Sequence, residues 1–310
     1  MHELEGILPL WKESGMTSHD CVFKLRKILK MKRIGHTGTL DPDVEGVLPI
    51  CVGQATKVAE YVMAQGKAYR ATVSLGASTT TEDASGEVVA RAQGPVVITK
   101  EELLSALAEL TGTITQTPPM YSAVKVNGRR LYEYAREGKV IDRPSREVTI
   151  HTLVLIEEPK QWSGDELTFV VDVACSKGTY IRTLAVQIGE LLGVPAHMKK
   201  LVRTNAGGFE SSEAVTLAEL AELFENDQIQ SVLQPIERSL KEWPYHEIPV
   251  DLEKAFSNGQ VVPAHTDLQI HDKIVIGKNG VAHAVYRAHP EKPGYMKPEK
   301  MFTRPEMEIQ

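Results

Sequence analysis

The stretch "GHTGTLDPDVEGVLPI", residues 35–50, decides how this chain is interpreted. It places three acidic residues in a loop that also contains Gly35, Gly38 and Gly46, directly after a basic segment. Glycine permits positive φ and close backbone approach, so the sequence predicts a flexible loop that presents a carboxylate beside a polyanion. The pair Asp41-Pro42 is also an ordinary turn initiator, and turn formation is the commoner role of such a pair.

The glycines of this loop match neither of two common nucleotide-binding motifs. The stretch lacks the Lys-Ser/Thr ending of a P-loop, and it is not a GxGxxG sequence that follows a strand. A bound nucleoside triphosphate or dinucleotide is therefore not predicted here.

The basic segment before the loop is "KLRKILKMKR", residues 24–33, with six basic residues and no acid. Ser18 can cap a helix that runs to about Arg33, with an apolar stripe at helical spacing. The basic side chains off this stripe either face solvent or contact phosphate groups of a polyanion. The candidates for phosphate contact are Lys24, Lys27, Lys30 and Arg33.

Composition indicates a soluble globular protein of about two domains. The chain has 310 residues, of which 42% are hydrophobic and 25% are charged. It has no apolar run of membrane-spanning length and no cleavable signal pattern, so we expect a cytoplasmic protein without a membrane partner. The net charge of −6 disfavours nucleic acid as a partner, but basic residues cluster at 24–33, 125–139 and 199–203.

The cysteines and histidines show no familiar metal or disulfide pattern. The three cysteines are far apart and lack CxxC spacing, and no histidine pair has HExxH spacing. Small buried thiols are the expected role of the cysteines. Neither a disulfide framework nor a metal site is predicted.

Strand and helix patterns mix without a regular βαβ rhythm, which favours an α+β fold over a doubly wound sheet. Strands are expected at 68–76, 146–156 and 167–175, and helices at 54–63 and 179–192. Capping boxes at Thr99/Glu102 and Thr216/Glu219 predict the starts of two more helices. A proline-containing break at 235–248 predicts a domain boundary, with one domain at 1–240 and a small β-rich domain at 245–310.

Extended to residue 57, the loop sequence "GHTGTLDPDVEGVLPICVGQATK" resembles the signature of the bacterial tRNA pseudouridine synthase B (TruB) family. Further matching segments are "GMTSHD" (15–20), "KAYRATVSLG" (67–76), "TEDASG" (81–86), "PPMYSAVKVNGRRLYEYAREG" (118–138), "CSKGTYIRTLA" (175–185) and "HMKKLVRTNAGGF" (197–209). The resemblance covers residues 5–236. It implies a pseudouridine synthase catalytic domain, with a mixed, largely antiparallel central sheet flanked by helices. The tail loosely resembles a compact PUA-type RNA-binding domain.

The resemblance also implies a function. Members of the family convert uridine 55 in the T-loop of tRNA to pseudouridine, without metal, nucleotide or organic cofactor. The implied partner is the T-arm stem-loop of tRNA; no protein partner is implied, and we expect a monomer. The alternative is a tRNA-folding or RNA-binding module in which catalysis is incidental.

Carried onto this chain, the family motifs assign roles to three residues of the catalytic centre. Asp41 is the catalytic aspartate, and Arg182 in "TYIRT" pairs with it. Tyr69 in "AYR" stacks on the target base.

Three further residues are assigned by the same resemblance. Leu201 in "LVRT" lines the pocket, and His36 helps to displace the target nucleotide. Lys12 contributes to the active site or to the RNA-facing surface. The chain departs from the family here, because it has Trp11-Lys12-Glu13 where the family usually has Asp-Lys-Pro.

The implied chemistry explains these residue types. Isomerisation breaks the N1–C1′ bond of uridine and joins C5 to C1′, so nothing is added or lost. An aspartate that acts on this bond must be ionised, whereas burial favours its neutral form. Arginine opposes that effect because it stays charged and can bind a carboxylate bidentately. Extruding a base costs a few kcal/mol, and stacking on Tyr69 can offset about 1–3 kcal/mol of that.

Overall fold

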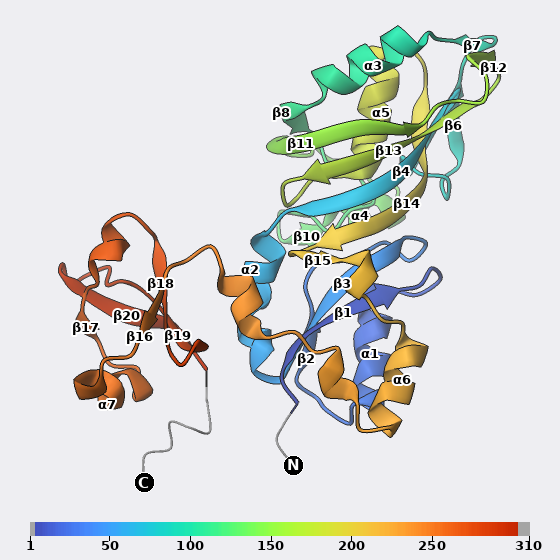
Figure 1. Cartoon of the computed structure of the whole chain (residues 1–310). Coiled ribbons are helices and arrows are strands. Elements are labelled where there is room, and N and C mark those ends of the chain that lie inside the picture. Colours follow the sequence, from blue (N-terminus) through green and yellow to red (C-terminus); the bar gives the residue numbers. More distant parts are fainter. Residues whose placement is uncertain (1–3, 303–310) are drawn as a thin grey trace.

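The computed structural model describes residues 4–302 and arranges most of their strands in two sheets (Figure 1). The larger sheet contains β1 (Gly6–Lys12), β2 (Ile34–His36), β3 (Glu45–Val52), β4 (Lys67–Leu75), β8 (Gly112–Gln116), β11 (Arg146–Glu157), β13 (Leu167–Cys175), β14 (Ala196–Ala206) and β15 (Phe209–Glu210). The main path runs β1-β3-β14-β4-β13-β11-β8, with β2 paired to β3 and β15 to β14. Within the described residues only the β3–β14 pairing of this sheet is parallel. The predicted α+β fold with a mixed, largely antiparallel sheet is confirmed.

Helices cover this sheet in two groups. The α-helices are α1 (Ser18–Ile28), α2 (Ala59–Ala64), α3 (Lys100–Glu109), α4 (Leu131–Arg136), α5 (Ile181–Leu191), α6 (Leu217–Glu225) and α7 (Glu253–Ser257). Short 3-10 helices are η1 (Gly53–Val58), η2 (Ser211–Glu213), η3 (Ile229–Ser231), η4 (Ile236–Leu240), η5 (Val250–Leu252) and η6 (Thr266–Gln269). Helices α3 and α5 pack beside β11, β13 and β4, whereas α1 and α6 lie together below β1 and β3 (Figure 1). The capping boxes predicted for α3 and α6 are both present.

Three two-stranded ribbons lie outside the larger sheet. They pair β5 (Ala77–Thr79) with β6 (Val88–Arg91), β7 (Val96–Val97) with β12 (Ser163–Gly164), and β9 (Lys125–Val126) with β10 (Arg129–Arg130). The β9–β10 turn has φ of 52° at Asn127 and 81° at Gly128, as a tight hairpin turn requires.

The first helix starts with a different cap from the one predicted. The hydroxyl of Thr17 accepts the N–H of Asp20, and the Asp20 carboxylate accepts the N–H of Thr17. This reciprocal pair is a capping box. Ser18, the predicted cap, is instead the first residue of the helix and is buried.

The same helix also ends earlier than predicted, at Ile28 rather than near Arg33. Lys30 adopts a left-handed conformation with φ of 52°, and the N–H of Met31 donates to the carbonyl of Arg26. This geometry closes a helix C-terminus without glycine. Lys30 and Arg33 therefore lie outside the helix in which they were predicted.

A second sheet follows the catalytic motifs in the chain, as expected for a β-rich tail. It contains β16 (Tyr245–Glu247), β17 (Val262–Pro263), β18 (Lys273–Lys278), β19 (Val281–Ala288) and β20 (Tyr295–Met301), in the order β16-β18-β19-β20-β17. It packs against η1 and α2, where the rings of Tyr61 and Trp243 meet edge-on at 4.8 Å. The Tyr61 hydroxyl also donates to Glu299 at 2.7 Å. None of the helices between residues 4 and 302 is long and apolar enough to cross a membrane.

Candidate active site

The loop that carries Asp41 is hydrogen-bonded on the N-terminal side of this residue. The buried hydroxyl of Ser18, in the first turn of α1, accepts the N–H of Leu40 at 2.9 Å. It also lies 3.3 Å from the Leu40 carbonyl, to which it can donate. The "GMTSHD" segment thus ties α1 to the residue immediately before Asp41.

The C-terminal side of Asp41 is held by a buried lysine. The Lys12 ammonium donates to the carbonyl of Pro42 at 3.0 Å and to that of Glu13 at 2.9 Å, and the residue is fully buried. The N–H of Gly15 donates to the same Pro42 carbonyl at 2.9 Å. Lys12 therefore lies under the loop and not on an RNA-facing surface. The sequence predicted a flexible loop, but hydrogen bonds hold the residues on both sides of Asp41, so the loop is anchored there.

The structure brings Asp41 and Arg182 together, although they are far apart in the sequence. An Nη2–Oδ2 distance of 3.2 Å joins them, and Arg182 is only 7% exposed. The other terminal nitrogen, Nη1, lies 3.5 Å from Asp83. The guanidinium also donates to the carbonyls of Thr81 at 3.1 Å and Tyr121 at 2.9 Å. Arg182 thus bridges two carboxylates and does not bind Asp41 bidentately, because its fork is shared among four acceptors.

The surroundings of Asp41 favour its neutral form. Burial raises its pKa above the usual range, Arg182 opposes that rise, and the nearby carboxylates of Asp83 and Asp43 add to it. Lys12 lowers the pKa by a smaller amount. The side chain remains 44% exposed because it opens into a cavity. Asp41 is therefore half-buried, and its charged form depends on Arg182.

Four residues assigned from the sequence line one cavity of about 360 Å³: Asp41, Tyr69, Arg182 and Leu201. A volume of this size is typical of small-molecule and cofactor pockets. A second, larger hollow of about 730 Å³ shares Asp41, Arg182 and Leu201 with it. The two form one cleft, and the smaller hollow, which Tyr69 lines, is its narrow end.

Tyr69 and Leu201 reach this cleft from neighbouring strands. Tyr69 lies on β4 opposite Arg203 of β14, and Leu201 lies two residues before Arg203 on the same strand. Tyr69 is 8% exposed, and burial raises the pKa of its hydroxyl. It is therefore neutral at physiological pH and offers the cleft an aromatic ring.

Arg203 is a part of the site that the sequence interpretation missed. It is 1% exposed; its Nε donates to the Val47 carbonyl at 2.7 Å, and its Nη2 lies 3.5 Å from the Gly38 carbonyl. Its backbone also presses on Gly46, where a Cβ would lie 2.2 Å from the Arg203 carbonyl oxygen. Strand alternation was the available signal, because Leu201 and Arg203 share a face of β14.

The narrow end of the cleft is basic. Besides Arg203, it is lined by Lys67, Arg146 and Lys177. Burial and the neighbouring Arg203 charge lower the pKa of Lys67 to about 8. This end is suited to anionic groups such as phosphate, and the sequence interpretation did not identify it.

The remaining predicted residues do not line either hollow of the cleft. His36 lies on β2; burial lowers its pKa, and its Nδ1 makes no hydrogen bond within residues 4–302. Lys24 and Lys27 are exposed on α1, with the Lys27 ammonium 4.4 Å from the centre of the Phe23 ring.

The two basic residues beyond α1 are placed differently from each other. The Lys30 ammonium is 6.0 Å from the centre of the Phe224 ring on α6. Arg33 is half-buried and its Nε donates to the Thr56 hydroxyl at 2.9 Å. Arg33 therefore makes a side-chain hydrogen bond to η1, whereas the contact of Lys27 is with an aromatic ring of its own helix.

The chain is similar to known proteins over nearly its whole length. Residues 26–181 match the model of the N-terminal domain of TruB family pseudouridylate synthases, and residues 182–241 match that of the tRNA pseudouridylate synthase B C-terminal domain. The tRNA pseudouridine synthase B of Listeria innocua is 51% identical over 301 residues, 96% of this chain and 98% of that protein. That of Bacillus cytotoxicus is 51% identical over 302 residues, 97% and 98% of the two chains.

Among solved structures, a chain of a Cbf5-Nop10-Gar1 complex superposes with a TM-score of 0.73 at 28% identity. The match covers 96% of this chain and 85% of that chain. The similarity therefore extends over both sheets and does not stop at the cleft.

Proposed function

The chain belongs to the TruB family of pseudouridylate synthases, and we propose that it modifies uridine 55 in the T-loop of tRNA, with Asp41 as the catalytic carboxylate. The protein is an enzyme that isomerises uridine to pseudouridine in tRNA, in keeping with the name its relatives share. The observation that carries the assignment of Asp41 is its 3.2 Å ion pair with Arg182, within the cleft that Tyr69 and Leu201 also line.

The proposed reaction uses the cleft as follows. The target base leaves its stack and enters the cavity, where the Tyr69 ring can stack on it. The ionised Asp41 carboxylate acts on the nucleoside while the N1–C1′ bond breaks, and the freed uracil turns so that C5 bonds to C1′. The C5 proton then leaves to water and N1 carries a proton in the product, so atoms and charge balance. Arg182 keeps Asp41 ionised throughout.

The basic groups divide into two sets in this proposal. Lys67, Arg146 and Lys177 at the narrow end of the cleft face the backbone of the extruded nucleotide. Lys24 and Lys27 on α1 meet phosphates of the T-arm outside the cleft. His36, half-buried on β2 just before the Asp41 loop, helps to displace the nucleotide.

We propose that catalysis and additional RNA binding belong to separate domains. Residues 1–240 form the catalytic domain, and residues 245–310 form a compact PUA-like RNA-binding domain; of these, 1–3 and 303–310 lie outside the described residues. The five-stranded sheet and the end of the matched family model at residue 241 support this boundary. The protein acts as a cytoplasmic monomer that needs no metal or organic cofactor for the isomerisation.

The test is release of tritium from tRNA labelled at C5 of uridine, without added metal or nucleotide. Asp41→Asn should lower the single-turnover rate by at least about 10³ and leave tRNA affinity nearly unchanged. Asp43→Asn is the matched control, because it makes the same change two residues away at an exposed position of the same loop. It should react like the parent protein at neutral pH, because loss of the Asp43 charge can only favour the ionised form of Asp41.

A second arm of the experiment tests the target position. A tRNA transcript with cytidine at position 55 should release no tritium, whereas the unaltered transcript should release one per tRNA. Asp41→Asn turnover at a tenth of the parent rate, or more, would overturn the role of Asp41. Release from the cytidine transcript would overturn the position.

A further inference from the structure

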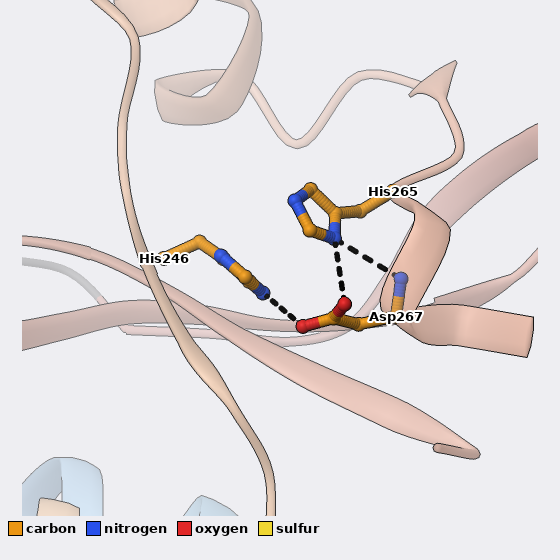
Figure 2. Close-up of side chains that lie close together, drawn as sticks. All are labelled: His246, His265 and Asp267. Atoms are coloured by element: carbon orange, nitrogen blue, oxygen red, sulfur yellow. Dashed lines mark hydrogen bonds and ion pairs between the residues drawn. The ribbon is translucent and has the colours of Figure 1, made fainter. Parts of the chain in front are cut away.

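Three metal-ligating side chains lie together in the C-terminal sheet region, away from the cleft. Figure 2 shows His246 and His265 converging on the carboxylate of Asp267. His246 lies on β16, which pairs with β18, and His265 is the N-cap residue of η6, in which Asp267 lies. Because η6 in turn contacts β18, the fold brings His246 to two residues that no local spacing motif would connect with it.

The ligand atoms are close to the separations that a bound zinc ion requires. His246 Nε2 is 3.0 Å from Asp267 Oδ2, His265 Nδ1 is 3.8 Å from Asp267 Oδ1, and all three ligand atoms lie within 4.8 Å of one another. Ligands at about 2.0–2.1 Å from a tetrahedral zinc ion are roughly 3.3 Å apart. Small side-chain adjustments would therefore close the site around an ion.

The hydrogen bonds of the cluster also suit metal binding. The backbone N–H of Asp267 donates to His265 Nδ1 at 3.2 Å, so this nitrogen is unprotonated, and a bound ion would take its lone pair in place of that N–H. The two imidazole rings lie against each other, with centroids 3.8 Å apart and planes tilted by 35°, and each has a nitrogen near the same carboxylate. All three residues are half-buried, so an ion could enter and keep a water ligand.

We propose that His246, His265 and Asp267 form a Zn²⁺ site with water in the fourth position. Two imidazoles and a carboxylate are ligands that zinc accepts, and three protein ligands plus water is a common zinc arrangement. The ion would join β16 to η6 and stabilise the fold of this sheet. The isomerisation does not use the site, because it lies on the second sheet and contributes nothing to the lining of the cleft.

Zinc binds neutral imidazole, so His246 would have to offer Nε2 as its unprotonated nitrogen and carry its proton on Nδ1, while acid protonates both nitrogens of an imidazole and blocks binding. Zinc affinity should therefore fall on acidification. The three cysteines are buried and offer no competing exposed thiol within residues 4–302.

The proposal is tested by calorimetric titration of the full-length, tag-free protein with ZnCl₂, together with thermal melts. We expect one zinc ion per chain and a melting temperature that rises with zinc concentration. His246→Ala and Asp267→Asn should each weaken binding at least tenfold. His151→Gln removes an exposed histidine of β11, in the other sheet, and should bind zinc like the parent.

Two outcomes would overturn the site. One is parent protein that binds zinc no more tightly than a His246→Ala/Asp267→Asn double variant, which would leave the cluster as a hydrogen-bonded anchor only. The other is tight binding that all the cluster variants retain. Metal-free melts identify any variant that has lost its fold; Asp267→Asn, which keeps the shape and one acceptor oxygen, then serves as the decisive variant.

Discussion

The cleft around Asp41 and the outer face of α1 both rely on polar side chains, but they differ in exposure to water. Ser18 and Lys12 under the Asp41 loop, and Arg182 in the cleft wall, are buried, and each makes two or more hydrogen bonds or ionic contacts. On the outer face of α1, Lys24 and Lys27 are exposed.

This difference sets the scale of the effects that substitutions should have. A buried polar group that loses its partner costs the full desolvation of that partner, whereas an exposed charge is hydrated and screened. We therefore expect single substitutions in the cleft to have large and specific effects. On α1, each charge should contribute a small, additive and salt-dependent increment.

The largest contrast is expected for catalysis, between Asp41→Asn and its loop neighbour Asp43→Asn, in the tritium assay described above. A smaller effect is expected from loss of the hydrogen bonds that anchor the Asp41 loop, and it can be measured as a change in the free energy of unfolding.

Ser18→Ala removes the buried hydroxyl that bonds to the backbone of Leu40, and should lower the free energy of unfolding by about 1–3 kcal/mol. Ser14→Ala is the matched control, since its exposed hydroxyl donates to the Asp43 carbonyl at 3.1 Å, where water can replace it. It should change the free energy by about 0.5 kcal/mol or less. Urea denaturation of both variants measures the difference. Equal losses of unfolding free energy would show that burial of the hydroxyl does not decide how much it stabilises the fold.

The smallest effects are expected on α1. The double variant Lys24→Gln/Lys27→Gln should reduce the magnitude of the salt dependence of tRNA binding by about one for each lysine–phosphate interaction that it removes. The same double change at the exposed residues Lys100 and Lys160 serves as the control and should leave the slope unaltered. Binding measured across a range of KCl concentrations gives the slopes. An unchanged slope in the α1 variant would mean that this face only contacts solvent.

Much of the fold was predictable because periodicity and caps are local signals. The strands near 68–76 and 167–175 alternate buried and less buried residues, and the Thr99 and Thr216 capping boxes start helices as their spacing predicts. The end of α1 was not predictable in this way. Lys30 takes the left-handed conformation that glycine usually supplies, so the basic run continues in sequence after the helix has stopped.

The candidate site was predictable only where a motif carried it. Asp41 and Arg182 came from the family resemblance, and the structure brings them together. Arg203 and Asp83 stand within motifs but look like ordinary surface charges until pairing of β4 with β14 and the fold of the 81–86 turn bring them inside. The cluster at His246 was invisible to spacing rules because His246 meets His265 and Asp267 only through the packing of β16 and η6 against β18.

The claim at the centre of this account is that Arg182 keeps Asp41 ionised. Burial raises the pKa of Asp41 and Arg182 opposes the rise, so removing the arginine charge should raise that pKa further. Because the carboxylate must be deprotonated to act, the acid limb of the rate profile should then move to higher pH.

The direct test is the single-turnover rate of pseudouridine formation against pH for the parent, Arg182→Lys and Arg182→Met. The lysine variant keeps the charge and loses the planar fork, so we expect a reduced rate with an acid limb near that of the parent. The methionine variant should be much slower, with its acid limb shifted upward, while tRNA affinity stays close to that of the parent in both. Equal rates in the two variants, with no shift of the acid limb, would contradict an electrostatic action of Arg182 on Asp41.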